Sequence, residues 1–176
     1  MTTGQHIETE FLEAYELYAD AIFRYCKIQT SDHQLALDLA QDTFTKTWEY
    51  LSAGKKVDQI RPFLYKVATN LIIDYRRKKK SYSLDAMLEG ETFDIKDSVD
   101  ATERHETIFD ATRARDALST LDEKYSDILT LRYIDDLSIK EIAEITGASE
   151  NATSVKIHRG LEKLKTVLGS DVPETI

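Results

Sequence analysis

The chain has 176 residues, of which 41% are hydrophobic and 31% charged, and its formal net charge is −9. This length allows one ordinary domain or two small ones, and the composition predicts a globular protein. The negative charge argues against a protein that binds duplex DNA tightly by itself, because neutralising phosphates supplies most of the affinity of such proteins.

The composition also disfavours membrane and secreted proteins. No apolar run approaches the roughly 20 residues that a spanning helix needs, and the N-terminus lacks the basic start and apolar middle of a signal peptide. The single cysteine, Cys26, cannot form an internal disulfide, which agrees with a reducing compartment. We therefore expect a cytoplasmic protein without membrane insertion.

Residues 8–80 are predicted to form a helical domain. Three periodic segments indicate helices over residues 8–30, 31–53 and 61–79. Ser31 or Asp32 is placed to cap the second helix and Gly54 to end it. Pro62 fits the first turn of the third helix, where its missing N–H is no loss.

The second of these helices has one apolar and one acidic side. Phe44 and Trp48 are expected in the core. The other side presents Asp38, Gln41 and Asp42. Such a side is usually only solvated, but it also suits a basic partner surface.

Residues 61–80 reverse the charge of the chain, because seven basic side chains and one acid give them a local charge of +6. An apolar stripe indicates that they form a helix rather than a loose tail. The opposite side presents Lys66, Asn70, Ile73 and Arg77. The cations of this side suit binding to a polyanion, and the amide of Asn70 suits the recognition of a specific group on that polyanion. The alternative is an amphipathic helix with a solvated charged end.

Residues 81–110 are predicted to be a flexible acidic linker, with a local charge of −7 and no helical periodicity over most of their length. Fully extended, about 30 residues span roughly 100 Å. The two ends of the chain therefore need not touch.

Residues 111–169 are predicted to form a second helical domain that contains a helix-turn-helix. Ser138 and Glu141 form a capping box, Gly147 supplies the turn, and Ser149 caps a longer helix. Small and basic outward residues near the start of that helix suit the major groove, although an ordinary helical hairpin is the alternative. The whole chain is thus predicted to be all-α, with two small helical domains joined by a flexible acidic linker.

Three segments, in this order, resemble the sigma-70 family of RNA polymerase sigma factors, specifically the small extracytoplasmic-function (ECF) group that has only regions 2 and 4. LALDLAQDTFTKTWEYL resembles region 2.2, RPFLYKVATNLIIDYRRKKK resembles regions 2.3 and 2.4, and residues 117–164 resemble region 4. The resemblance covers roughly residues 8–168. It implies a factor without enzymatic activity that binds core RNA polymerase and directs promoter recognition and DNA melting.

The resemblance also implies three groups of site residues. At the polymerase contact it places Asp38, Gln41, Asp42 and Phe44. At the minus-ten element it places Lys66, Asn70, Asp74, Arg76, Arg77 and Lys78, followed by a loop to Leu84. At the minus-thirty-five element it places Arg132, Ser154, Val155, Lys156, His158 and Arg159. Tyr65 is a further candidate, for stacking on a base.

The chain departs from the family pattern at three positions. Ser154 and Val155 stand where the family usually carries more basic and hydroxyl residues, and Gly160 stands where it carries alanine. These differences bear on the promoter sequence rather than on the activity. The expected partners are core RNA polymerase and promoter DNA, as duplex and as melted single strand, with an anti-sigma factor as a further candidate. No cofactor and no metal site are expected.

Three other functions are alternatives to this one. A stand-alone helix-turn-helix regulator of transcription would not need the second basic surface at residues 61–80. A small enzyme is disfavoured because the four histidines are scattered and no nucleophile, metal-ligand or phosphate-loop pattern occurs. A degenerate relative would bind polymerase without opening promoters.

Overall fold

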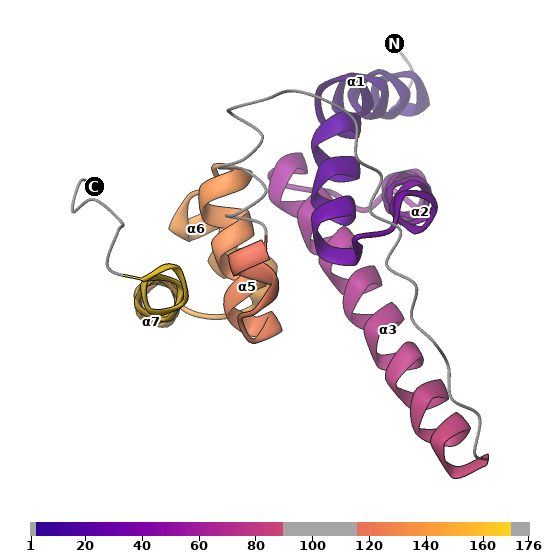
Figure 1. Cartoon of the computed structure of the whole chain (residues 1–176). Helices are drawn as coiled ribbons and strands as arrows, with labels where there is room; N and C mark the ends of the chain where they lie inside the picture. The colour runs from indigo at the N-terminus through magenta and orange to yellow at the C-terminus, as the bar shows by residue number, and fades with distance from the viewer. Residues whose placement is uncertain (1–2, 90–115, 170–176) are drawn as a thin grey trace, which may run out of the picture. The chain divides into compact units, whose positions relative to one another are not determined.

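The computed structural model describes residues 3–89 and 116–169. Both stretches consist of helices and their connections, without any strand (Figure 1). They belong to two separate compact units, in agreement with the predicted all-α fold of two small domains. No helix in these stretches is long and apolar enough to cross a membrane.

Residues 3–89, the described part of the N-terminal unit, form three helices. They are α1 (Thr3–Thr30), α2 (His33–Ser52) and α3 (Ile60–Glu89). Asp32 rather than Ser31 caps α2, because its carboxylate accepts a hydrogen bond from the N–H of Leu35 at 3.0 Å. Ser31 instead makes the turn, with a left-handed φ of 56°. Pro62 lies in the first turn of α3, as predicted.

Aromatic and aliphatic side chains from all three helices form the core of this unit. The hydroxyls of Tyr25 in α1 and Thr69 in α3 are hydrogen-bonded at 2.9 Å inside it. The ring of Tyr25 also packs edge-on against that of Tyr65, with centroids 5.3 Å apart. Other fully buried side chains include Ile22, Cys26, Ala36, Leu64 and Ala68. Together these contacts fix which side of α3 faces the core.

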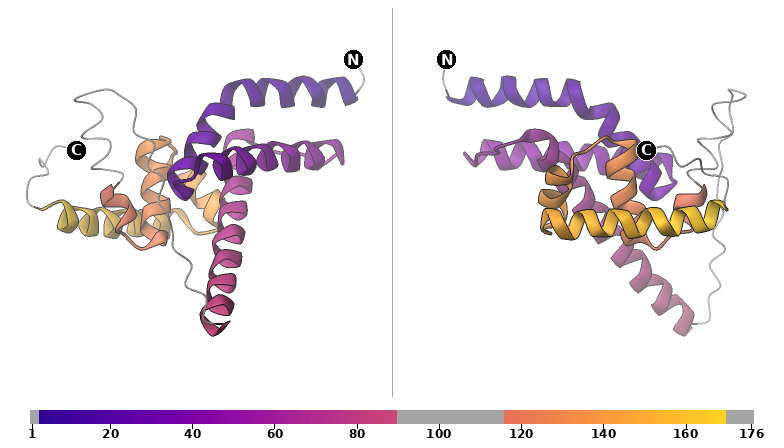
Figure 2. Two further views of the ribbon diagram at one scale, coloured as in Figure 1. Left: turned by 45° about the vertical axis from the view of Figure 1, so that its right-hand side comes forward. Right: turned by 90° about the vertical axis from the view of Figure 1, so that its left-hand side faces the viewer.

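Four aromatic rings join the first half of α1 to α2. Phe11 contacts both Phe44 and Trp48, and Tyr15 contacts Phe44, with centroids 4.9 to 6.3 Å apart. Beyond this contact α1 bends, which both views of Figure 2 show. The expectation that Phe44 and Trp48 are core residues is correct for Phe44, which is 5% exposed, but wrong for Trp48, which is 39% exposed.

The third helix is longer than predicted, because α3 runs to Glu89 rather than to residue 79. Residues 81–89 contain no glycine or proline, and the next helix breaker in the sequence is Gly90. The last turns of α3 extend past α1 and α2 (Figures 1 and 2). The predicted linker, residues 81–110, thus begins as helix, and its residues 90–110 lie outside the described part of the chain. The expectation of a loop up to Leu84 is therefore wrong, because this segment is part of α3.

The C-terminal unit contains the predicted helix-turn-helix. Among its described residues, 116–119 are helical and are followed by α5 (Glu123–Leu129), α6 (Ile139–Thr146) and α7 (Glu150–Leu168). The capping box is confirmed, because Ser138 and Glu141 exchange side-chain and backbone hydrogen bonds of 2.8 and 3.2 Å. Gly147 ends α6 with a left-handed φ of 69°. Ser149 caps α7, accepting from the N–H of Ala152 at 3.2 Å.

A π-helical turn, η1 (Thr130–Ile134), continues α5 and was not predicted. The N–H of Asp135 bonds to the carbonyl of Thr130 at 3.1 Å, five residues back. Asp136 then takes a left-handed φ of 50°. The chain is thereby redirected so that Ser138 can begin α6.

One side of α7 packs against the rest of the unit. Thr153, Ile157 and Gly160 are buried, and Leu161 and Leu164 are half-buried. A Cβ at position 160 would lie 3.3 Å from the side chain of Leu129. Glycine at this position therefore lets α7 approach α5 closely.

Candidate functional site

The acidic side of α2 is exposed, as the sequence predicted. Asp38, Gln41 and Asp42 all face solvent, and Asp38 accepts a hydrogen bond from the amide of Gln34 at 3.2 Å. Phe44 differs from these three, because its ring is buried against α1. Phe44 can hold α2 in place beneath the exposed acids, but it is not part of the exposed surface.

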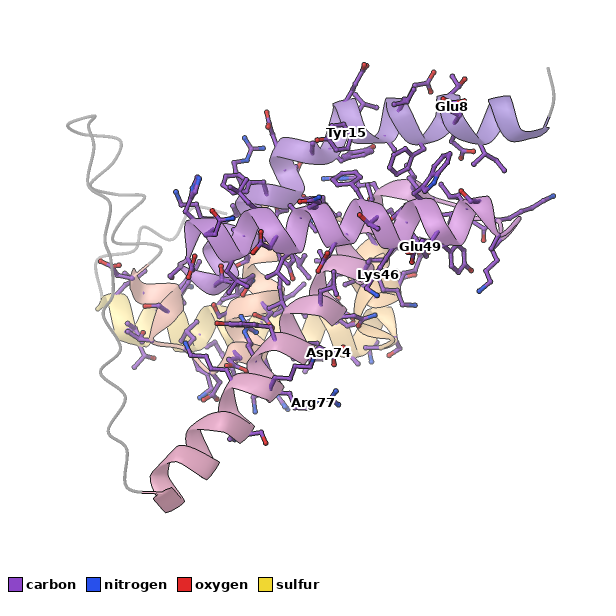
Figure 3. The ribbon with its side chains drawn as sticks, turned by 90° about the vertical axis from the view of Figure 1, so that its right-hand side faces the viewer. Glu8, Tyr15, Lys46, Glu49, Asp74 and Arg77 are labelled. Carbon is purple, nitrogen blue, oxygen red and sulfur yellow. The ribbon has the colours of Figure 1, made fainter. Side chains whose placement is uncertain are left out.

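Two apolar side chains flank these acids and were missed by the sequence reasoning. Leu37 is 43% exposed, and Trp48 exposes the part of its ring that does not pack against Phe11. Lys46 and Glu49 lie on the side of α2 away from α1 (Figure 3). A spacing of eleven residues places Leu37 and Trp48 on one side of a helix, and this signal was available in the sequence.

The predicted outward side of α3 is confirmed as a surface. Lys66, Asn70, Ile73 and Arg77 are all exposed, and Lys78 is exposed on the adjoining side of the helix. Ile73 is 49% exposed, so an apolar group lies between the amide and the guanidinium. This side of α3 thus offers charge, a donor and acceptor pair, and an apolar contact within a few helical turns.

Asp74 and Arg77 form an ion pair on this surface. Their oxygen and nitrogen are 3.0 Å apart, and both side chains are more than half exposed. Figure 3 shows both near the middle of α3. Exposed pairs of this kind stabilise a protein by well under about 1 kcal/mol. An anionic ligand can therefore compete for Arg77 at little cost.

Arg76 has a different environment from its neighbour. Its guanidinium donates to the side-chain oxygen of Gln29 at 2.7 Å and to the carbonyl of Gln29 at 3.2 Å. The residue is half-buried and ties α3 to the last turn of α1. Tyr65 is buried, so the expectation that it stacks on a base is wrong.

In the C-terminal unit, α7 presents most of the predicted site residues to solvent. Val155, His158 and Arg159 are exposed, and Ser154 and Lys156 are half-buried. The imidazole Nε2 of His158 lies 3.4 Å from the carboxylate of Glu162. No other candidate site residue on α7 takes part in an ion pair within the described residues.

Arg132 does not belong to this surface of α7. It lies in η1 and is half-buried, and its Nη1 donates to the carbonyl of Leu137 at 2.8 Å. The contact closes the turn between η1 and the cap of α6. Sequence reasoning could not find it, because the π-helical turn that brings the two groups together leaves no clear pattern.

Comparison with protein families assigns both units. Residues 14–82 match the model for sigma-70 region 2, and residues 111–164 match the model for sigma-70 region 4. The two matches cover the helices that carry the two exposed surfaces and the helix-turn-helix. A chain with these two regions is a sigma factor of the sigma-70 family, which directs RNA polymerase to promoters.

Curated relatives narrow the assignment to the ECF group. The chain is 30% identical over 172 residues to the ECF RNA polymerase sigma factor SigW of Bacillus subtilis, covering 90% of this chain and 88% of SigW. It is 29% identical over 161 residues to the ECF sigma factor SigM of the same organism, covering 91% and 96%. This protein therefore belongs to the ECF sigma factors with regions 2 and 4.

Solved structures share the fold. The sigma factor RpoE, in its complex with the anti-sigma factor NepR from Bartonella quintana, is 21% identical with a TM-score of 0.77, covering 93% of this chain and 99% of that one. CnrH, in complex with the cytosolic domain of CnrY, is 20% identical with a TM-score of 0.69, covering 97% and 96%.

The family membership establishes the general function. As a sigma factor, the protein binds core RNA polymerase and promoter DNA and acts in the initiation of transcription. Sigma factors have no enzymatic activity of their own, so the exposed surfaces described above are not parts of a catalytic centre.

Proposed function

We propose that three exposed surfaces of this sigma factor have separate binding roles. The acidic side of α2 binds the polymerase, the outward side of α3 reads and melts the minus-ten element, and α7 enters the major groove of the minus-thirty-five element. The observation that supports this division is the opposite charge of two neighbouring helices. Asp38 and Asp42 face solvent on α2, whereas Lys66, Arg77 and Lys78 face it on α3.

Because α2 is acidic and α3 is basic, the two surfaces suit different partners. Carboxylates on α2 repel phosphates, so the partner of α2 is a basic protein surface, and the exposed Leu37 and Trp48 supply apolar contacts beside them. Cations on α3 attract phosphates, and the amide of Asn70 can pair with a base edge. We therefore assign the polymerase contact to Asp38, Gln41 and Asp42.

Melting requires a surface that binds a separated strand better than the duplex. A cationic groove for phosphates and a site for unstacked bases supply that preference. Arg77, Lys78 and the segment up to Leu84 follow Asn70 along the chain and would hold the strand. Arg76, which is engaged with Gln29, would contribute by fixing α3 against α1.

On α7, the exposed Val155, His158 and Arg159 would contact base edges and phosphates, with Ser154 and Lys156 beside them. Arg132 would act through the turn that it closes.

The protein would work in the cytoplasm, where the polymerase is. An anti-sigma factor is a further proposed partner. Both structural relatives described above were solved in complex with another protein, and the partner of RpoE is named as an anti-sigma factor.

Charge reversal on α2 tests the assignment. The double substitution Asp38→Lys with Asp42→Lys should weaken binding to core polymerase by roughly tenfold or more, because like charges would face each other across the contact. Affinity is measured by titrating labelled protein with core enzyme. The matched control is Glu13→Lys with Asp20→Lys, which makes the same charge change at exposed positions of α1.

An equal loss in both variants would show that net charge, not the α2 surface, determines the affinity. Specific binding of a palindromic duplex without polymerase would instead support the stand-alone regulator.

A further inference from the structure

The exposed line of side chains on α7 begins one turn earlier than the sequence analysis placed it. Because Thr153, Ile157 and Gly160 are buried, the rotation of α7 about its axis is fixed. The residues opposite them, spaced by three or four, are Asn151, Val155, His158 and Glu162. All four are exposed. Asn151 thus lies one turn before Val155 on the same side of the helix.

The carboxamide of Asn151 has no structural task in the described part of this unit. Ser149, not Asn151, caps α7 and bonds to the N–H of Ala152. The side chain of Asn151 takes part in no hydrogen bond or ion pair among the described residues. Asparagine is also less favourable than alanine inside a helix, so helix stability does not explain the residue.

The position of Asn151 suits a base contact. In helix-turn-helix proteins the first residues of the second helix contact base edges in the major groove. A carboxamide pairs with N6 and N7 of adenine through two hydrogen bonds, and an apolar side chain contacts the methyl group of thymine. One helical turn rises about 5.4 Å, and base pairs are about 3.4 Å apart. Two residues one turn apart therefore reach bases one or two pairs apart.

We propose that Asn151 is a specificity-determining residue that reads an adenine in the minus-thirty-five element, one or two base pairs from a thymine read by Val155. The inference rests on the proposed placement of α7 in the major groove. It adds a base and a residue that the sequence analysis did not include.

The test compares holoenzymes that contain the wild-type or the Asn151→Ala sigma factor. Each is offered a linear duplex promoter library that is randomised across the upstream element, and the bound sequences are counted. The wild type should prefer adenine at one position by about tenfold, and Asn151→Ala should lose this preference alone. Thr166→Ala, which changes an exposed residue about 22 Å further along α7, should leave every preference unchanged.

Two further measurements separate base reading from a structural role. Replacing the selected adenine by 7-deaza-adenine removes the N7 acceptor, which should weaken wild-type binding about tenfold and Asn151→Ala not at all. Asn151→Asp keeps the shape and adds a charge that favours a helix N-terminus. It should therefore keep the unit folded, as followed by circular dichroism, and still lose the preference for adenine.

The possible failures are distinguishable. If the wild-type holoenzyme selects no sequence in the upstream element, α7 is not in the major groove, and the proposed function fails together with the inference. If it selects sequences that Asn151→Ala leaves unchanged, or if 7-deaza-adenine weakens both holoenzymes equally, only the assignment of Asn151 is wrong.

Discussion

At the scale of single residues, two arginines that the family resemblance assigns to DNA have partners within the protein. Arg76 holds Gln29 at the end of α1, and Arg132 holds the carbonyl of Leu137 before α6. In both cases the guanidinium joins parts of the chain that a sequence pattern does not bring together. A basic residue in a DNA-binding region thus has two uses, and only the structure distinguishes them.

Salt dependence separates the two uses in the C-terminal unit. Arg132→Ala should lower the free energy of unfolding of this unit by about 1–2 kcal/mol, because a charge-assisted hydrogen bond is lost. It should leave unchanged the slope of log affinity against log salt for promoter DNA. Lys156→Ala should lower that slope by about 1 with little effect on unfolding, because a phosphate contact is lost. A fall of the slope in Arg132→Ala would mean that this residue contacts DNA directly.

A buried hydroxyl in α7 offers a second prediction. Thr153 is buried, and its Oγ1 has no hydrogen-bond partner among the described residues. Thr153→Val should therefore raise the free energy of unfolding by about 1 kcal/mol, measured by urea denaturation. The matched control is Thr130→Val, which removes a hydroxyl that donates to the carbonyl of Ser126 at 2.9 Å and should be destabilising. Equal effects of the two substitutions would contradict this explanation.

At the scale of helices, much of the fold was predictable because local signals and burial agree. The caps at Asp32, Ser138 and Ser149 follow from short polar patterns next to helical periodicity. The π-helical turn at residues 130–134 was not predictable, since it depends on how α5 meets the turn before α6. The roles of the exposed side chains stay predictions, because exposure shows what is accessible and not what binds.

The outward side of α3 yields a prediction at this scale. Asn70→Ala should reduce the base preference at the minus-ten element while leaving polymerase affinity unchanged, since Asn70 is exposed on α3 and the proposed polymerase surface is on α2. Lys66→Ala, on the same side, should weaken all promoter sequences alike, because a phosphate contact carries no sequence information. Both are measured with promoter variants and holoenzyme. Loss of polymerase affinity in Asn70→Ala would mean that this side of α3 is misassigned.

At the scale of the whole molecule, the charge of the chain fits a factor that reaches DNA through a partner. The net charge is −9, although residues 61–80 carry +6. Phosphate contacts from so few cations give modest affinity. Polymerase can raise the effective concentration of both units at the promoter without any new contact to DNA. The same arrangement would limit binding of the free protein to DNA away from the polymerase.

Transcription in vitro tests the central claim most directly. Core RNA polymerase and fragmented genomic DNA are combined with and without the protein, and the starts of the transcripts are mapped. The protein should create new starts preceded by two shared sequence elements about two duplex turns apart, a separation of roughly 70 Å. A set of starts that is the same with and without the protein, although the protein binds the core enzyme, would contradict its assignment as a promoter-opening sigma factor.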